Sequence, residues 1–286
     1  MPRFSLIVAT KDRTDEFSVL LQSLEKQEMR DFELIVVDQN SDDRLSSLLK
    51  EWSSKVSVSN DARCPIQVKL LHSIPGASKA RNLGLLHSCG DILAFPDDDC
   101  WYHPDTLQNV DTWFRQHGEY GILSVGCRDE QGLVSSNRWG QAECDIKWIN
   151  IFRTSGTCCY FVHRPSSEIP LLFDESLGPG AGTIFGCGED TDFLLTLMNY
   201  GIRGRFYSVL HVGHPRRDGF VDVKRAESYG GGFGRVLAKH SNPYLFFGLV
   251  IFDFARATLS LLRGDCSRAS RLFAHGRGMI RAYFSK

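Results

Sequence analysis

A short apolar run that ends in three carboxylates constrains this chain more than any other stretch of its sequence. Residues 92–95 predict a buried β-strand, and Pro96 ends it. Asp97, Asp98 and Asp99 follow at the carboxyl end of that strand, the edge where open α/β sheets bind their ligands. Three adjacent carboxylates repel one another, and a hard divalent cation shared with a diphosphate would compensate their charge. The plain alternative is an acidic turn, because Asp is common in turns.

The rest of the N-terminal half alternates between strand and helix patterns. Near-continuous apolar runs predict strands at residues 4–9, 33–38 and 67–71. Apolar residues at helical spacing predict helices at residues 17–24, 45–52 and 77–86. This order predicts an α/β fold whose mostly parallel sheet is flanked by helices and joined by right-handed crossovers.

The C-terminal half continues the pattern less regularly. Helices are expected at residues 104–115 and 189–200. Strands are expected at residues 122–126, 157–163 and 204–211. Residues 165–182 predict a loop rich in Pro and Gly that is long enough to be a functional segment. A polar loop is expected at residues 55–63, and residues 132–150 show no assignable pattern.

The composition limits the classes of protein to which the chain can belong. Its 286 residues suffice for one large domain, expected at residues 1–240, and an appendage at residues 241–286. The 33 Lys and Arg residues against 34 acids give a net charge of −1, which argues against a nucleic-acid partner. Nine cysteines without metal-ligand spacing suit reduced thiols in a cytosolic protein. No signal peptide is expected before the first strand.

Residues 243–286 form a tail that is both basic and apolar. Seven bases and two acids give this tail a local net charge of +5. Asp253 and Arg256 interrupt its apolar stretch, residues 244–262, which argues against a transmembrane helix. We expect two amphipathic helices that bind the surface of an anionic membrane. The alternative is a packing helix with a solvated basic face.

Four motifs follow one another in a recognisable order. Residues 9–13 (Ala-Thr-Lys-Asp-Arg) follow the first strand, and Asp38 ends the second. Residues 76–84 (Gly-Ala-Ser-Lys-Ala-Arg-Asn-Leu-Gly) enter the helix that precedes the acids at 97–99. Together these motifs resemble the family 2 glycosyltransferases of the GT-A fold, which transfer a sugar from a nucleotide donor with inversion. The resemblance covers residues 4–240 and implies a GT-A, Rossmann-like sheet.

The resemblance implies a donor site at the carboxyl edge of the sheet. Thr10 and Arg13 would lie against the nucleoside, and Asp38 would accept the N–H of the base, as a carboxylate can. The other residues implied to bind substrate are Gly76, Arg81, Asp97 on the ribose side, Asp98 and Glu189. As alternatives, Arg81 would be a helix-surface base and Asp38 a turn former. Gln39 and Asn40 stand where the family often has Asn-Gly or Asn-Ala, which blurs the identity of the base.

The resemblance also implies a metal site. Asp99 would hold Mn²⁺ or Mg²⁺ together with the donor diphosphate. Residues 211–215 (His-Val-Gly-His-Pro) resemble the family's late His-Pro segment, whose histidine can complete the site. His214 is favoured over His211 by its position relative to Pro215, and imidazole beside a carboxylate-bound Mn²⁺ is chemically reasonable.

A catalytic base is expected at the start of the helix at 189–200. Residues 186–190 (Gly-Cys-Gly-Glu-Asp) resemble the Glu-Asp motif that opens the acceptor-side helix of the family. Asp190 is the expected base, and Glu189 and Asp192 are its rivals. The alternative is that all three acids only favour the helix N-terminus, where a negative charge gains about 0.3–1 kcal/mol. The Gly-rich residues 229–234 are expected to allow close helix packing near the acceptor.

The lead hypothesis is an inverting, metal-dependent hexosyltransferase. Its donor would be a nucleotide sugar, with a UDP-sugar favoured, and its acceptor a lipid-linked or glycan hydroxyl in cell-surface polysaccharide biosynthesis. The protein would be cytoplasmic and peripheral on the inner face of the cell membrane. A nucleotidyltransferase or a Rossmann oxidoreductase would need a Gly-rich loop after the first strand, and residues 10–14 contain no glycine. A non-catalytic sugar-nucleotide-binding protein would not need both Asp99 and Asp190.

Overall fold

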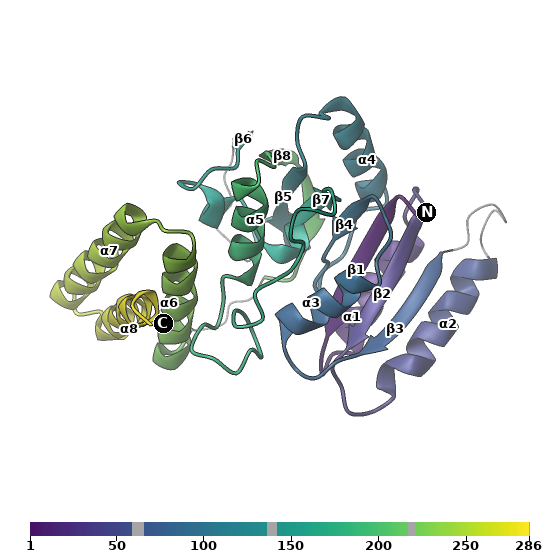
Figure 1. Ribbon diagram of the computed structural model, residues 1–286. Coiled ribbons are helices and arrows are strands. Elements are labelled where there is room, and N and C mark those ends of the chain that lie inside the picture. Colours follow the sequence, from purple (N-terminus) through teal and green to yellow (C-terminus); the bar gives the residue numbers. More distant parts are fainter. Residues whose placement is uncertain (59–65, 136–141, 217–220, 286) are drawn as a thin grey trace. The chain divides into compact units, whose positions relative to one another are not determined.

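The computed structural model describes residues 1–58, 66–135, 142–216 and 221–285 (Figure 1). In these residues the strands are β1 (Phe4–Thr10), β2 (Phe32–Asp38), β3 (Gln67–His72), β4 (Ile92–Ala94), β5 (Ile122–Arg128), β6 (Cys144–Asp145), β7 (Tyr160–His163) and β8 (Gly204–Gly213). The α-helices are α1 (Asp15–Glu25), α2 (Arg44–Val58), α3 (Ala77–Leu86), α4 (Thr106–Gln116), α5 (Glu189–Asn199), α6 (Val223–Lys239), α7 (Pro243–Leu262) and α8 (Cys266–Tyr283). Two 3₁₀ helices, η1 (Ile151–Arg153) and η2 (Thr157–Cys159), precede β7.

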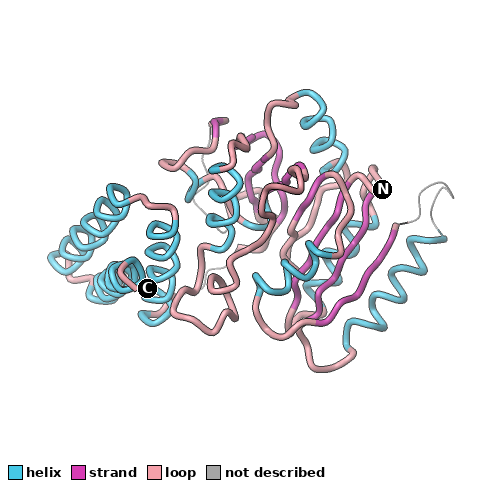
Figure 2. The backbone as a smooth tube through the Cα atoms, in the orientation of Figure 1, coloured by secondary structure: helices cyan, strands magenta, loops and turns pink. Residues whose placement is uncertain are grey.

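The strands of the described chain form one eight-stranded sheet in the order β3-β2-β1-β4-β7-β5-β8-β6 (Figure 2). The four strands from β3 to β4 are parallel, and so are β5 and β8. Strand β7 runs antiparallel to both β4 and β5, and the short β6 runs antiparallel to β8. The prediction of a mostly parallel sheet is therefore confirmed.

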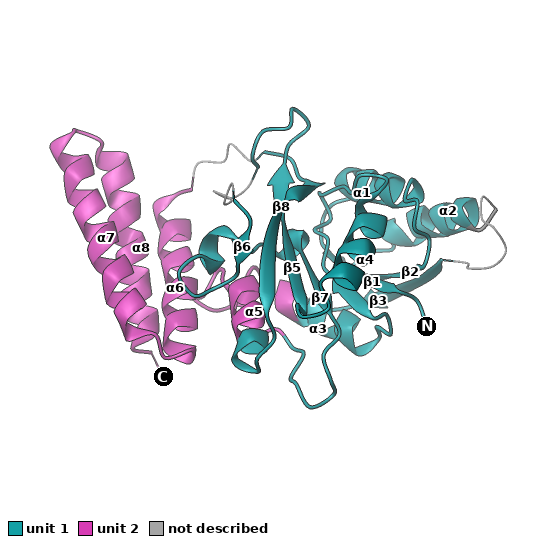
Figure 3. Cartoon of the chain, turned by 90° about the horizontal axis from the view of Figure 1, so that it is seen from above, with its two compact units in different colours: residues 1–75, 79–172, 196–217 teal, residues 76–78, 173–195, 218–286 magenta. Residues whose placement is uncertain are grey.

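Apolar strands covered on both faces explain why the centre of this sheet is buried. Every residue of β2 is buried, and so are all but Ala9 in β1. Helices α1 and α3 lie on opposite sides of the sheet (Figures 1 and 3). Trp52 of α2 donates its indole N–H to the carbonyl of Leu21 in α1, at 2.9 Å. On the other face Gly84 lets α3 approach the Ile7 side chain, which a Cβ at position 84 would meet at 2.3 Å.

The chain divides into two compact units (Figure 3). The first comprises residues 1–75, 79–172 and 196–217 and contains the whole sheet. The second comprises residues 76–78, 173–195 and 218–286 and contains the start of α5 together with α6, α7 and α8. The expected domain boundary near residue 240 lies inside this second unit and stays a prediction about separate folding.

Close glycine contacts bring α6 and α8 together in the second unit. A Cβ at Gly230 would lie 1.9 Å from the carbonyl oxygen of His275, and one at Gly234 would lie 2.2 Å from that of Met279. From the α8 side, a Cβ at Gly278 would lie 2.0 Å from the carbonyl oxygen of Glu227. Both helices approach this closely because neither carries a side chain at the contact points. The expected close helix packing of the Gly-rich segment is confirmed.

Helix α7 is the one described helix that is long and apolar enough to cross a membrane by length and composition. It has 20 residues and contains an 18-residue window with a mean hydropathy of 1.8. Of the residues in that window, 22% are buried. Its buried residues are Phe246, Asp253, Ala257 and Ser260, on the side that packs against α8. Asp253 Oδ2 lies 2.6 Å from Nδ1 of His275 in α8. The acid that interrupts the apolar sequence is therefore turned inward.

Several sequence-based expectations need correction. Residues 157–159, expected to begin a strand, form the 3₁₀ helix η2, and β7 begins only at Tyr160. Helix α2 continues to Val58, so residues 55–58 are helical, and residues 59–63 of the expected loop lie outside the described chain. Strand β8 extends to Gly213, two residues beyond its expected end. The unassigned segment 132–150 contributes β6, whose two residues pair with β8.

Candidate functional site

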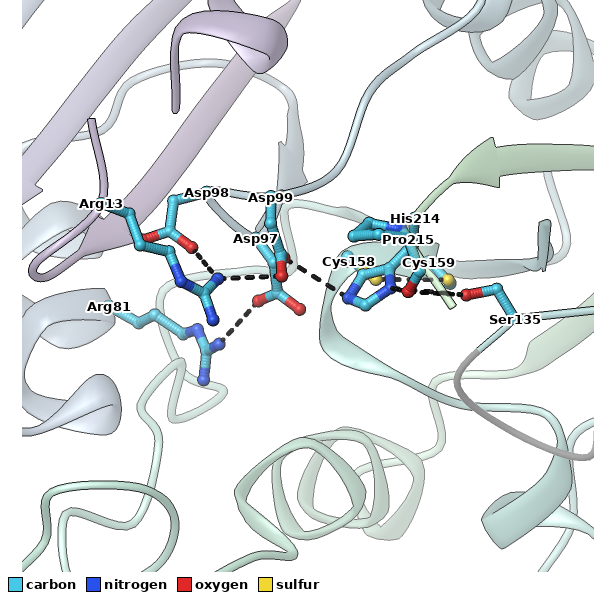
Figure 4. A network of polar contacts seen from close by, with 10 residues as sticks. All are labelled: Arg13, Arg81, Asp97, Asp98, Asp99, Ser135, Cys158, Cys159, His214 and Pro215. Carbon is cyan, nitrogen blue, oxygen red and sulfur yellow. Dashed lines mark hydrogen bonds and ion pairs between the residues drawn. The ribbon is translucent and has the colours of Figure 1, made fainter. Parts of the chain in front are cut away.

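Three carboxylates lie at the carboxyl end of β4, as predicted, and two arginines compensate part of their charge (Figure 4). Nη1 of Arg13, from the turn after β1, lies 2.5 Å from Oδ1 of Asp98 and 2.9 Å from Oδ2 of Asp99. Nη2 of Arg81, from α3, lies 3.3 Å from Oδ1 of Asp97. Each acid thus lies beside a guanidinium from another element, which the sequence pattern alone did not indicate.

The loop after these acids is tied to the end of β8. The N–H of Trp101 donates to the carbonyl of Gly213 at 2.9 Å, and the N–H of Gly213 donates back at 2.8 Å. The indole lies against the Gly213 backbone, where an added Cβ would come within 1.9 Å of it. This bridge brings the next residue, His214, to the acids, with its Nε2 3.4 Å from Oδ1 of Asp99.

A hydrogen bond orients the His214 ring. Its Nδ1 lies 2.7 Å from the carbonyl oxygen of Pro215, and the hydroxyl of Ser135 donates to the same oxygen at 3.2 Å. Because a carbonyl oxygen can only accept, Nδ1 carries the proton in neutral His214. The lone pair is then on Nε2, the nitrogen that faces Asp99. A ligating histidine needs this orientation, which metal sites secure through such outer hydrogen bonds.

Asp97, Asp99 and His214 could together hold a metal ion. One ligand atom from each of the three lies within 4.8 Å of the other two. Two carboxylates and one imidazole are the oxygen-rich donor set that suits Mg²⁺ or Mn²⁺. Asp97 is expected to face the ribose, and the structure also places it among the possible metal ligands. Sequence reasoning missed this second role.

His211 lies in a different environment from His214. Its ring centroid is 4.9 Å from that of His103, in an edge-to-face arrangement. Both rings line a cavity of about 480 Å³ whose apolar part includes Val125 and Phe161. Burial, followed by the neighbouring His103, lowers the pKa of His211. The geometry therefore places His214, and not His211, beside the acids.

Burial and charge oppose each other in the acid cluster. Burial raises the pKa of Asp98 more than the Arg13 charge lowers it. For Arg13, burial lowers the pKa, but the charges of Asp98 and Asp99 outweigh it and leave the pKa raised. The guanidinium therefore remains charged beside the acids.

The ends of β1 and β2 provide the expected nucleoside side of the site. Thr10 and Asp38 are register partners in the parallel ladder, and both are buried. Oδ1 of Asp38 accepts the backbone N–H of Asn40 at 2.8 Å and its side-chain amide at 2.7 Å. Oδ2 of Asp38 is buried and has no hydrogen-bond partner among the described residues. An unsatisfied buried acceptor is costly, and the N–H of a ligand could satisfy it.

Gly76 belongs to the second unit, as does Glu189, whereas the other residues implied to bind substrate belong to the first. Its φ of 144° lies in the region that favours glycine. The next residue, Ala77, donates its N–H to the carbonyl of Pro179 at 3.0 Å, and the Ser78 hydroxyl donates to the carbonyl of Leu177 at 2.8 Å. These two hydrogen bonds connect the start of α3 to the long loop before α5. The turn at Gly76, which leads into α3, favours glycine because of its positive φ.

The three acids at the start of α5 have different environments. Glu189 is buried, and a Cβ at Gly178 would lie 2.7 Å from its carboxyl carbon. Asp192 is also buried, and its two oxygens contact Lys239 and His240 at 2.8 Å each. Asp190 is partly exposed and accepts the N–H of the next residue, Thr191, at 2.6 Å. Of the three acids, Asp190 is the one that reaches solvent.

Sequence comparisons agree with the motif order. The model of the family described as Glycosyl transferase family 2 matches residues 5–161. An uncharacterised glycosyltransferase of Haemophilus influenzae is 34% identical over 106 residues, 37% of this chain and 32% of that protein. The poly(ribitol-phosphate) beta-N-acetylglucosaminyltransferase TarS of Staphylococcus aureus is 28% identical over 120 residues, 41% of this chain and 20% of TarS. The matched segments therefore span about a third or less of these relatives.

Solved structures share the fold at low sequence identity. A mannosyltransferase from Pyrobaculum calidifontis, in complex with GDP-Man and Mn²⁺, has a TM-score of 0.65 at 16% identity and covers 100% of this chain and 88% of its own. S. aureus TarS 1–349 with UDP-GlcNAc has a TM-score of 0.57 at 17% identity, with coverages of 98% and 91%. These likenesses agree with the expected GT-A fold. Because the family model matches more than half of the sequence, the chain belongs to glycosyl transferase family 2.

Proposed function

We propose that this chain is an inverting, metal-dependent glycosyltransferase that moves a sugar from a nucleotide-diphosphate donor to a hydroxyl acceptor. The observation that carries the proposal is the cluster of Asp97, Asp99 and His214 at the carboxyl edge of the sheet. Such a donor set, in a chain of this family, suits the diphosphate of a nucleotide sugar.

On the donor side, the residues at the strand ends bind and orient the nucleotide. Asp38 offers its unpaired Oδ2 to an N–H of the base, and the buried Thr10 closes that end of the site. Arg13, held by Asp98, is proposed to lie against the nucleoside, and Arg81, held by Asp97, to shape the nucleotide pocket, where a guanidinium suits phosphate oxygens. A UDP-sugar is the favoured donor. TarS bound to UDP-GlcNAc and the mannosyltransferase bound to GDP-Man support a nucleotide sugar in general.

Asp97, Asp99 and His214 would hold Mn²⁺ or Mg²⁺. The bound ion would neutralise the charge that develops on the leaving diphosphate. The Pro215 carbonyl fixes the ring of His214, and Arg13 holds Asp99 from its other side. These contacts pre-set the ligands, so little reorganisation is needed when donor enters.

On the acceptor side, Asp190 is the proposed base. Displacement with inversion needs one carboxylate that removes the proton of the attacking hydroxyl. The helix N-terminus stabilises the ionised form that a base requires. The neighbouring acids suit the role less well, because Glu189 is buried and Asp192 already holds two cationic partners.

The proposed acceptor is a glycan or lipid-linked hydroxyl in cell-surface polysaccharide synthesis. The name of TarS describes transfer to a poly(ribitol-phosphate), and a B. subtilis relative, EpsH, is 30% identical over 38% of this chain and 29% of its own length. The chain is proposed to act from the cytoplasmic surface of the cell membrane.

Helix α7 supplies the proposed membrane-facing surface. The side opposite α8 exposes large apolar side chains: Tyr244 (91% exposed), Phe247, Ile251, Phe252, Leu259 and Leu262. Asp253 is turned away from this side toward His275, so the apolar face is continuous although the apolar sequence is not. Exposed arginines of α8, among them Arg268, Arg277 and Arg281, suit anionic lipid headgroups. Because α8 covers one side of α7 with this basic surface, the helix is proposed to lie on the membrane and not to span it.

The proposed base is tested with two matched substitutions. Asp190→Asn keeps the size of the side chain but cannot take a proton. It should bind donor normally and lose transfer by about 10²–10⁴-fold, the usual scale of general-base catalysis. Glu189→Gln, at the adjacent buried acid, tests the rival assignment. Near-normal turnover in Asp190→Asn with an inactive Glu189→Gln would move the role to Glu189.

A further inference from the structure

Helix α6 holds the segment that carries the proposed base. The N–H of Gly186 donates to the carbonyl of Ser228 at 3.0 Å, and the Cys187 thiol donates to the carbonyl of Tyr229 at 3.3 Å. Glycine permits this approach, because a Cβ at Gly232 would lie 2.1 Å from the carbonyl oxygen of Cys187. All of these residues belong to the second unit. The loop before α5 thus lies directly against the α6 backbone.

The C-terminal end of α6 contacts α5 through buried charged groups. Nζ of Lys239 lies 2.8 Å from Oδ2 of Asp192, and Nε2 of His240 lies 2.8 Å from Oδ1. The side chains of Asp192 and His240 are 1% and 4% exposed. Lys239 also contacts Asp174 at 3.0 Å, on the loop that precedes α5. A carboxylate that is buried to this degree is held strongly, because removing its partners would leave a buried charge without compensation.

The geometry of an α-helix relates the contacts of Asp192 to the direction of the Asp190 side chain. Residues two apart on a helix with 3.6 residues per turn point about 200° away from each other. With Asp192 fixed toward the end of α6, the side chain of Asp190 is directed to the opposite side, where it reaches solvent. The contacts of Asp192 with Lys239 and His240 therefore set the rotation of the first turn of α5 about its axis.

We propose that Asp192, Lys239 and His240 form a positioning clamp that aims Asp190 at the acceptor hydroxyl. The clamp rests on the proposed function of Asp190 as base. None of its three residues needs to touch substrate. Their role is to keep the base within the narrow range of positions from which it can take a proton, since a displacement of 1 Å can cost about 100-fold in rate.

A second Asp–His pair with a buried carboxylate, in which the imidazole is 25% exposed, provides the control. Asp253 in α7 and His275 in α8 are 2.6 Å apart in the same unit, and they join α7 to α8 instead of α6 to α5. Removing either imidazole leaves a buried carboxylate short of a partner, so both substitutions should lower stability. Only the loss of His240 should change the position of Asp190.

The experiment compares His240→Ala with His275→Ala in the full-length protein. Thermal unfolding, donor affinity, and kcat and KM for the acceptor are measured for both. His240→Ala should lower kcat by about 10- to 100-fold with unchanged donor affinity. His275→Ala should stay within about twofold of the parent, by the same reasoning. Lys239→Arg, which keeps the charge, should retain more of kcat than Lys239→Met.

The outcomes separate this inference from the proposed function. If Asp190→Asn remains active, the assignment of the base fails, whatever the clamp variants do. If Asp190→Asn is inactive while His240→Ala keeps the kcat of His275→Ala, the clamp is overturned and the base stands. Equal losses of kcat in both histidine variants would assign the effect to stability alone and would also overturn the clamp.

Discussion

Glu33 in β2 offers a sharp test of the electrostatics that hold the sheet together. Its side chain is fully buried. Oε1 accepts the Ser5 hydroxyl and the Cys89 N–H at 2.7 Å each, and Oε2 accepts the Lys69 ammonium at 2.7 Å. Burial raises the pKa of Glu33, but the hydrogen bonds from Lys69, Cys89 and Ser5 outweigh burial and bring it from 4.5 to about 2. We therefore expect the ionised carboxylate to stabilise the fold.

The size of this stabilisation follows from the pKa. A shift from 4.5 to about 2 corresponds to on the order of 3 kcal/mol, at about 1.4 kcal/mol per pKa unit. Water screens part of it, because the side chain of Lys69 is 35% exposed. Since the folded-state pKa is depressed, the stabilisation is complete above pH 4.5 and is lost as the pH falls toward 2. Glu33→Gln should lower the free energy of unfolding by about 2–3 kcal/mol at pH 7.

Urea unfolding at pH 7, 5 and 3 measures this effect. Glu51→Gln is the matched control, because Glu51 contacts Lys55 at the same 2.7 Å but both side chains are more than half exposed. That control should change stability by less than about 1 kcal/mol. The difference in free energy of unfolding between the parent and Glu33→Gln, here called the gap, should be smaller at pH 3 than at pH 7. A gap no larger than that of the control, or one that does not change with pH, would refute the reasoning.

Two further predictions concern the metal and the tail. Asp99→Ala should abolish Mn²⁺ binding measured by electron paramagnetic resonance, and metal-dependent transfer with it, while the exposed Asp42→Ala should not; full transfer activity in EDTA would contradict a metal role. The double variant Phe247→Asp/Ile251→Asp should not float with anionic vesicles at low salt, whereas Leu86→Asp, at a more exposed position on the first unit, should float like the parent. Parent protein that ignores anionic vesicles but dimerises through α7 would show that a second copy covers this face.

Much of the first unit could be predicted because its signals are local. The apolar runs of β1 and β2 and the acids after β4 each specify a strand and its end within a few residues. Parallel pairing then brings the carboxyl ends of these strands to one edge, so the nearness of Thr10 and Asp38 follows from topology alone.

The choice between His211 and His214 for the proposed metal site could not be settled from sequence, because a break in strand register decides which of them lies beside the acids. Val125 pairs with Tyr207, but the next residue, Gly126, pairs with His211, so β8 holds extra residues at this point. In an unbroken ladder, position 128 would pair with Leu210 in place of Gly213. His211 would then occupy the position next to the acids that His214 has now. No local pattern in the sequence announces this irregularity.

Contacts between segments that are distant in the sequence could not be predicted from the sequence either. Asp192 is a rival base in the sequence because it lies at the same helix N-terminus as Asp190, and its burial and its contacts with Lys239 and His240 distinguish it. Asp253 looked like an interruption of an apolar helix until its pairing with His275 placed it on the inner side. Both outcomes depend on which face of a helix meets a neighbour, and periodicity alone does not specify the neighbour.

The glycines of α6 and α8 reverse a common rule of protein engineering. Replacing a helical glycine by alanine usually gains about 0.5–1 kcal/mol, so such positions are among the first that a stabilisation campaign would change. At Gly230, Gly234 and Gly278 the added methyl group would meet a backbone carbonyl that cannot move aside without separating the helices. Gly248 in α7 has nothing within 4 Å of a Cβ, so the rule holds there. Four glycines that look alike in the sequence would thus respond in opposite directions to one substitution.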